Sequence, residues 1–309
     1  MRGMARSMKQ RILNMLRPLM GHFPRLLMSY RLTRAHWRLL DDPAPTPLGF
    51  RLVGNAAMER GKFEREETDL IRALLQEADM FINVGANIGY YCCLAASAGK
   101  PVIAFEPIAL NLQFLLKNVE ANGWGELVDI VPVALSDSPG VAKIYGGGTG
   151  ASLVKGWANG PEHYPTLVAT STLDAEAGPR VAGKRCLVVV DIEGAEMRML
   201  GGARGLLAMS PRAMWIVEIS VGEHQPRGVA LNPQLLETFQ VFWAGGYEAW
   251  TTSRPYRRVE PAEVRGIVAS GVDTLGTHNF LFVEAGRRGP WSSPGAKGAE
   301  SARDTKAGA

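Results

Sequence analysis

The 309 residues are 46% hydrophobic and 21% charged, with a net charge of +4, which is typical of a folded chain with one large domain or two small ones. No run reaches about 18 uninterrupted apolar residues, so the sequence predicts no transmembrane helix. The three cysteines form no CxxC pair. This argues against a disulfide framework or a zinc cluster and favours a reduced, cytoplasmic chain.

The N-terminal segment carries most of the positive charge. Residues 1–40 contain nine Lys or Arg and no acid, which leaves a net −5 for the rest of the chain. Arg17, Pro18 and Gly21 interrupt the apolar stretch that a secretory signal needs. We expect residues 1–44 to form a basic amphipathic extension. It can pack on the main domain, contact nucleic acid, or lie peripherally on the inner membrane surface.

From residue 45 to 284, continuous apolar runs alternate with segments of helical spacing. This pattern predicts an α/β domain with a mostly parallel sheet and helices on both faces. Residues 140–175 interrupt it with short strand-like pieces around a glycine-rich loop, which indicates a hairpin-like insertion. In chain order, we expect a helix within 61–78, strand 80–86, helix 88–98, strand 101–107, helix 110–121, strand 128–137, strand 186–194, helix 195–207, strand 213–220, helix 235–244 and strand 279–284.

The C-terminal residues 285–309 are rich in Gly, Ala, Ser and charge. Such a composition cannot bury a core, so we expect a disordered tail.

In an open parallel sheet, ligands bind outside the carboxyl ends of the strands. The first strand ends in the turn Asn83-Val84-Gly85-Ala86-Asn87-Ile88-Gly89. Gly85 permits a sharp turn and Gly89 a close helix approach, because neither has a Cβ. The free N–H groups of the following helix suit a carboxylate or phosphate. A plain strand-to-helix turn would show the same pattern.

Glu106 ends the second strand, 21 residues after Gly85. An acid at that distance from a glycine turn is placed to accept hydrogen bonds from ribose hydroxyls. Together the two features indicate a cofactor that contains adenosine. Pro107 and Asn111, which follow Glu106, are further candidates for cofactor contact, as is Ala86 in the turn.

Two more strand ends carry polar residues. Ser136 and Asp137 could face the adenine or simply cap a turn. Asp191, Glu193 and Glu196 follow the most continuous apolar run of the chain. Asp191 could anchor the positive end of the cofactor, act as a base, or hold a divalent cation, for which no other feature speaks. Acids at a helix start also stabilise the helix dipole, which is the structural explanation for Glu193 and Glu196.

The glycine turn helps to distinguish between two cofactors. A dinucleotide site uses GxGxxG, whose second glycine makes room for the pyrophosphate. Asn87 stands at that position here. S-adenosylmethionine has no pyrophosphate, so this turn favours methyl transfer over hydride transfer.

Several stretches resemble the FkbM family of S-adenosylmethionine-dependent methyltransferases across about residues 60–284. They are NVGANIGYY, AFEP, VPVALSD, STLD, VVVDIEGAE and NFLFV, in that order. The resemblance implies the seven-stranded class I methyltransferase sheet with its last strand antiparallel. It also implies O-methylation of a sugar, glycolipid or polyketide hydroxyl. The family usually has Asp where this chain has Asn83 and often Lys where it has Val189.

For catalysis, the candidates to take the proton of the acceptor hydroxyl are Asp191 and Glu193, then Glu218 at the end of the fifth strand, and His224 after it. Glu64 could reach the amino group of the cofactor. Trp243, Tyr247 and Trp250 could stack on a sugar or belong to the core. The chain has no NPPY-like tetrapeptide, so methylation of nucleic-acid bases is not expected. The alternatives are an NAD(P)-dependent oxidoreductase and a non-catalytic, membrane-associated adapter, and Asn83 in place of the family's Asp favours the adapter.

Overall fold

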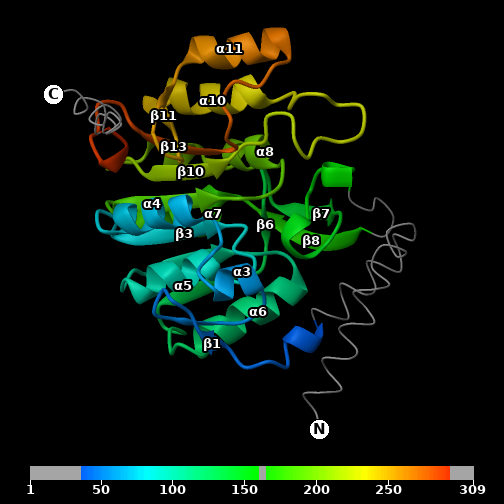
Figure 1. Cartoon of the computed structure of the whole chain (residues 1–309), viewed down its shortest axis with the longest axis vertical. Coiled ribbons are helices and arrows are strands. Elements are labelled where there is room, and N and C mark those ends of the chain that lie inside the picture. Colours follow the sequence, from blue (N-terminus) through cyan, green and yellow to red (C-terminus); the bar gives the residue numbers. More distant parts are fainter. Residues whose placement is uncertain (1–35, 160–164, 293–309) are drawn as a thin grey trace, which may run out of the picture.

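The computed structural model describes residues 36–159 and 165–292, which form a central sheet between two layers of helices (Figure 1). The sheet has eight strands in the order β12-β11-β13-β10-β9-β3-β4-β5. Their bounds are β3 Met80–Val84, β4 Val102–Phe105, β5 Val128–Val131, β9 Cys186–Val190, β10 Met214–Glu218, β11 Tyr247–Thr251, β12 Arg258–Val259 and β13 Asn279–Glu284.

The five strands from β5 to β10 are all parallel. β13 runs antiparallel between β10 and β11. The order reverses between β3 and β9, which is where an open α/β sheet binds its ligands. The expected mostly parallel sheet with an antiparallel last strand is present. The sheet has one strand more than the expected seven, because the two-residue β12 pairs with the edge of β11.

Both faces of the sheet are covered, which explains why its strands are continuously apolar. One face packs on α4, α5 and α6. The other packs on α7, α8, α9, α10 and α11. The helix bounds are α4 Arg65–Leu75, α5 Tyr90–Ser97, α6 Ala109–Glu120, α7 Leu173–Val181, α8 Glu196–Gly201, α9 Arg204–Ala208, α10 Leu235–Ala244 and α11 Pro261–Ser270.

Two expected elements are interrupted. The strand predicted at 128–137 ends as β5 at Val131, and β6 (Ala134–Leu135) joins a different sheet. Pro132 lies between them and has no N–H for a ladder.

The helix predicted at 195–207 is broken into α8 and α9 at Gly201 and Gly202. A Cβ on Gly202 would lie 2.2 Å from the Ser136 carbonyl oxygen, so the chain passes too close to β6 for any larger residue.

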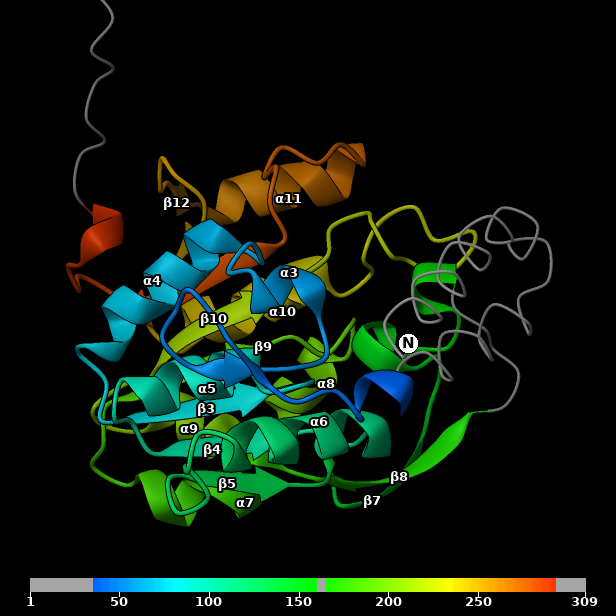
Figure 2. The same cartoon turned by 60° about the horizontal axis from the view of Figure 1, so that its bottom comes forward.

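The insertion is a hairpin. β7 (Gly140–Ile144) pairs antiparallel with β8 (Thr166–Ser171), and β6 pairs with β8 to make a three-stranded sheet. Figures 1 and 2 both show this hairpin projecting to one side of the main sheet. The connection from β7 to β8 contains two short 3₁₀ turns, η1 (Gly148–Gly150) and η2 (Trp157–Asn159).

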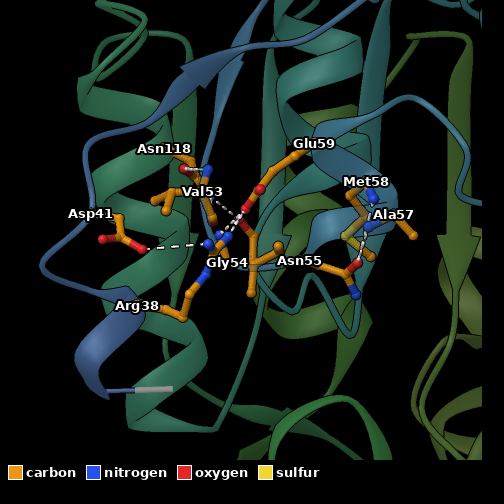
Figure 3. Close-up of polar contacts among 10 residues, drawn as sticks. Arg38, Asp41, Val53, Gly54, Asn55, Ala57, Met58, Glu59 and Asn118 are labelled. Atoms are coloured by element: carbon orange, nitrogen blue, oxygen red, sulfur yellow. Dashed lines mark hydrogen bonds and ion pairs between the residues drawn. The ribbon is translucent and has the colours of Figure 1, made fainter. Parts of the chain in front are cut away.

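The described end of the N-terminal extension is tied to the domain (Figure 3). Arg38 pairs with Asp41 and with Glu59 at the end of α3 (Ala56–Glu59), and Glu59 also accepts the Gly54 N–H. Lys117 on α6 donates to the Leu39 carbonyl at 2.7 Å. β1 (Ala44–Pro45) and β2 (Arg51–Leu52) then form a small antiparallel pair. The contacts predicted for residues 1–35 lie outside the described residues.

The C-terminal boundary lies later than expected. Residues 285–292 do not start a disordered tail, since Trp291 in η3 (Pro290–Ser292) is 1% exposed and packs against the α4 side of the core. Arg287 pairs with Glu77 at 2.7 Å. A large indole supplies the apolar area that the surrounding small residues lack.

Candidate active site

The turn after β3 depends on its glycines. Gly85 has φ +84°, and a Cβ there would lie 1.9 Å from the Asp191 carbonyl oxygen. Gly89 has φ +88°, and a Cβ there would lie 2.4 Å from Leu115 Cδ1 on α6. The turn therefore brings the ends of β3 and β9 together and lets α5 pack closely on α6, as expected for Gly89. Asn87 also has a positive φ, 50°, which Asn tolerates better than most residues.

Glu106 binds this turn from the end of β4. Its carboxylate accepts the Asn87 N–H at 2.7 Å, the Ile108 N–H at 2.8 Å and Asn111 Nδ2 at 3.2 Å. The side chain is 3% exposed, and this burial raises its pKa. A carboxylate has about four lone-pair directions, so one acceptor position is left for a ligand.

Polar side chains form a row across the ends of β9, β10 and β13. Glu218 on β10 is paired with Asn279 on β13. The last pair between β10 and β9 is Val217 with Val190, so the next residues, Glu218 and Asp191, lie side by side. The carboxyl groups of Asp191 and Glu218 hydrogen-bond to each other. Two carboxyls can do so only if they hold a proton. Burial raises both pKa values, that of Asp191 well above its usual range and that of Glu218 to about 8.

The first turn of α4 and the start of α5 cover this row. Glu67 is 7% exposed and accepts Asn279 Nδ2 at 2.5 Å, and its burial together with the nearby Glu64 and Asp191 carboxylates raises its pKa. Glu64 accepts the Tyr91 hydroxyl at 2.6 Å. Glu64 has φ 37°, and desolvation of its carboxylate raises its pKa. The row therefore consists mainly of carboxyl groups. The side chains that donate hydrogen bonds to Glu67 and Glu64 are the neutral Asn279 and Tyr91.

Two further acids lie in or just after the turn Asp191-Ile192-Glu193-Gly194, which we call the DIEG turn, and each has its own hydrogen-bond partners. Glu193, with φ 56°, accepts Trp157 Nε1 at 2.6 Å through its side chain and Ser152 Oγ at 2.5 Å through its carbonyl. Glu196 turns back to accept the Gly194 N–H at 2.8 Å. Burial raises the pKa of Glu196 to about 7. Glu196 thus lies in the first turn of α8, as its position in the sequence suggested, and its carboxylate binds the turn that precedes the helix.

These elements enclose a cavity of about 590 Å³, including its open mouth. Its wall contains six of the residues predicted for cofactor binding and the predicted base Glu193. Its remaining wall is mainly apolar and includes four residues of the insertion. The predicted residues in the wall are Gly85, Asn87, Glu106, Pro107, Asn111, Asp191 and Glu193; the insertion supplies Ile144, Gly148, Ala151 and Leu153.

Other predicted residues lie outside the cavity wall. Asn83 is 3% exposed and donates to Cys92 Sγ at 3.4 Å, and Ala86 and Gly89 shape the turn. The Ser136 N–H donates to the Ser171 carbonyl, and Ser136 Oγ donates to Asp137 Oδ1, so both residues fasten a loop. Glu64 and Glu218 belong to the acidic row beside the cavity and do not line its wall.

His224 and the three aromatic candidates also have structural contacts. The His224 ring packs edge-on against Trp157, with centroids 6.1 Å apart. Tyr247 is 3% exposed and donates its hydroxyl to the Leu207 carbonyl. Trp243 and Trp250 pack against the two halves of the core. None of the three presents a stacking face to the cavity wall.

Three residues at this edge were not identified from sequence. Glu67 lies one helical turn from Glu64, a spacing that could have drawn attention to it. His278 precedes β13, half exposed, with Nδ1 3.6 Å from Glu223 Oε1. Trp157 lies in a segment with no periodicity, so no local signal marks it. Among the described residues, no group of three or more His, Cys, Asp or Glu is placed to hold a metal ion.

The strand order, the reversal between β3 and β9 and the antiparallel β13 define the class I methyltransferase fold, which is Rossmann-like. A model of the family described as "Methyltransferase FkbM domain" matches residues 83–249, more than half of the chain. The chain belongs to the FkbM methyltransferase family.

Solved structures of similar shape include an FkbM methyltransferase from Methylobacillus flagellatus, with 15% identity over 67% of this chain and a TM-score of 0.39. That match covers 43% of the other chain, less than half of its length. A putative O-methyltransferase from Klebsiella pneumoniae has 13% identity, covers 72% of this chain and 81% of its own, and has a TM-score of 0.38. Magnesium protoporphyrin IX methyltransferase from Synechocystis, solved with bound S-adenosylmethionine, has 10% identity, covers 85% and 97%, and has a TM-score of 0.39. No curated protein matches the sequence significantly.

Proposed function

We propose that this protein transfers a methyl group from S-adenosylmethionine to a hydroxyl of a sugar, glycolipid or polyketide-type small molecule. The observation that carries the proposal is the cavity at the ends of β3, β4 and β9, where Glu106, Asn87 and Asp191 meet. Its wall combines a few polar groups with mainly apolar residues, as small-molecule sites do.

The residues present fit this cofactor. Asn87 lines the cavity, and its buried Oδ1 has no hydrogen-bond partner among the described residues. A buried acceptor without a partner is costly, so a ligand donor there would be favourable. Glu106 keeps one acceptor position for a ribose hydroxyl. The apolar wall around Val133, Leu135 and Ile144 suits an adenine ring.

When bound, the cofactor supplies an electrophilic methyl group on a sulfonium. The chain itself binds, orients and excludes water, and alignment of this kind can contribute up to about 7–11 kcal/mol. A base for the acceptor proton adds about 10²–10⁴-fold. Glu193 is the first candidate because it lines the cavity outside the Asp191–Glu218 pair. Burial raises the pKa of both carboxyls of that pair, that of Glu218 to about 8, which favours their protonated forms.

The oxidoreductase alternative conflicts with the family assignment. The non-catalytic adapter remains an alternative, but Asn83 does not favour it. The Asn83 side chain lies against Cys92 rather than in the cavity wall, so the replacement of Asp there removes no carboxylate from the wall. Contact of residues 1–40 with the inner membrane surface and a cytoplasmic location also remain proposals. No described helix is both long and apolar enough to span a bilayer.

The proposal is tested with S-adenosylmethionine carrying a ¹³C-labelled methyl group and a panel of sugars, glycolipids and polyketide alcohols. Carbon NMR distinguishes a methyl on oxygen from one on nitrogen or carbon. An O-methyl product made by the wild type and not by Glu106→Ala would support the proposal. Labelled methyl found only on nitrogen or carbon would overturn the hydroxyl assignment.

A further inference from the structure

Trp157 contacts the candidate active site although it belongs to the insertion. The side chain is 5% exposed, yet it packs in none of the main hydrophobic clusters. Its Nε1 donates to Glu193 Oε2 at 2.6 Å. A buried indole N–H usually finds a partner, and here the partner is a carboxylate of the cavity wall.

The Trp157 ring also fills the space that a side chain at position 194 would occupy. A Cβ on Gly194 would lie 2.4 Å from Trp157 Cζ3 and 2.6 Å from Cε3. Gly194 has φ +93°, which only glycine adopts readily. The glycine of the DIEG turn therefore serves two needs, the backbone conformation and contact with the indole.

Further hydrogen bonds hold the same segment at three places around the cavity. Ser152 Oγ donates to the Glu193 carbonyl at 2.5 Å. The Ala158 N–H donates to the His224 carbonyl at 2.6 Å. Asn111 Nδ2 donates to the Gly148 carbonyl at 3.3 Å. The segment from Ile144 to Ala158 thus joins the start of α6, the DIEG turn and the loop after β10.

The cavity is shaped by this arrangement. Glu193 lines it from the sheet side, and Ile144, Gly148, Ala151 and Leu153 line it from the insertion. Glu193 has a positive φ of 56°, which costs about 1 kcal/mol or more for a residue with a side chain. Contacts with Trp157 and Ser152 offset that cost and hold the carboxylate at the wall.

We propose that Trp157 is a positioning residue of the cofactor site: it fixes the Glu193 carboxylate and closes the insertion over the cavity. This inference rests on the proposed function. Trp157 does not line the cavity, whereas Glu193 does. If Trp157 acts through Glu193, its effect on binding should disappear when the Glu193 carboxylate is removed.

The test is calorimetric titration with S-adenosylhomocysteine of the wild type, Trp157→Phe, Glu193→Asn and the double variant. Phe keeps an aromatic ring but removes the N–H, and Asn tolerates the positive φ while withdrawing the carboxylate. Trp157→Phe should weaken binding about tenfold, comparable to one hydrogen bond to a charged group. In the Glu193→Asn background it should weaken binding less than about twofold, since the two residues act as one unit.

A matched control and a second variant keep the test decisive. Trp243→Phe removes an indole N–H from a half-buried side chain on α10, away from the cavity, and should leave the affinity unchanged. Ser152→Ala removes the second contact with Glu193 without touching the indole and should weaken binding about threefold. Thermal unfolding of each variant shows whether it is folded.

The outcomes distinguish a failure of the positioning role of Trp157 from a failure of the proposed function. If the wild type binds S-adenosylhomocysteine and folded Trp157→Phe binds equally well, the positioning role is wrong and the proposed function stands. Additive losses in the double variant would likewise overturn it and leave an ordinary packing role. If the folded wild type does not bind S-adenosylhomocysteine, the proposed function fails, and this inference fails with it.

Discussion

At the scale of single residues, buried side-chain amides and carboxylates fix the backbone around the site. Glu106 binds two N–H groups of two different turns. Asn118 on α6 is fully buried and binds both the N–H and the carbonyl of Val53 (Figure 3). It also donates to the Ile88 carbonyl. Because buried backbone groups need partners, each of these side chains holds several segments at once.

Asn118→Ala should therefore cost about 3 kcal/mol of unfolding free energy, because it leaves three buried backbone groups unpaired. Asn122, one turn later, makes the same two bonds to Arg51 but is half exposed, so water can replace it. We expect Asn122→Ala to cost about 1 kcal/mol. Urea unfolding of both variants measures the difference, and equal costs would contradict the role given to burial.

Residues that act within one turn could be predicted from sequence, whereas residues that act across the fold could not. Gly85, Gly89 and Glu106 follow from spacing, because the strand-turn-helix pattern fixes where they lie. The contact between Trp157 and Glu193 joins residues 36 positions apart, and that between Asn118 and Val53 joins residues 65 apart. No local pattern encodes either distance.

At the scale of elements, close approaches of the backbone decide where helices end. Gly201 and Gly202 divide the helix that apolar spacing predicts as continuous. Gly202 passes so near the Ser136 carbonyl that its Cβ would overlap it, while a Cβ on Gly201 would lie 3.2 Å from Asp137 Cβ. The break therefore belongs to the contact with β6 and the insertion rather than to helix propensity.

Gly202→Ala should lower the unfolding free energy by about 2–4 kcal/mol, because backbone must move to admit the methyl group. Gly201→Ala, on the neighbouring residue, should change it by less than about 1 kcal/mol, since Asp137 Cβ at 3.2 Å need shift by only a few tenths of an ångström and Ala favours helix. Thermal or urea unfolding compares the two. A Gly202→Ala variant as stable as Gly201→Ala would refute the steric explanation.

The strands of the parallel half and most of its helices were predictable from their apolar patterns. α7 was not predicted, since it contains Gly178 and Pro179 and buries only Leu173, Ala177 and Val181. β11 and α11 were missed for a physical reason. β11 alternates buried and half-buried residues, because one of its two faces is only partly covered, and so it lacks a continuous apolar run. α11 contains Gly266 and buries only Val264 and Ile267, so its periodicity is weak.

At the scale of the whole molecule, α4, the DIEG turn and β10 bring carboxyl groups together with no Lys or Arg ion pair to them in the described part of the chain. The ordinary pKa of a Glu side chain is 4.5, and in the folded protein it rises to about 8 for Glu218 and about 7 for Glu196. The folded state thus binds more protons than the unfolded state between these values, so stability must fall as pH rises through this window.

We predict that the free energy of unfolding decreases by about 6 kcal/mol between pH 5 and pH 9 through these two groups, at about 1.36 kcal/mol per unit of pKa shift. Glu218→Gln keeps the shape but removes the titration, so the variant should lose less stability over the same interval. Glu120→Gln on the exposed side of α6 serves as the control and should follow the wild type. Parallel curves for the wild type and Glu218→Gln would count against the raised pKa.

The most direct measurement is calorimetric titration of the wild type and Glu106→Ala with S-adenosylhomocysteine and, separately, NADH. We predict micromolar binding of S-adenosylhomocysteine, a loss of about tenfold or more in Glu106→Ala, and no binding of NADH. Tight binding of NADH without binding of S-adenosylhomocysteine, or equal affinities of the wild type and Glu106→Ala for S-adenosylhomocysteine, would contradict the cofactor site described here.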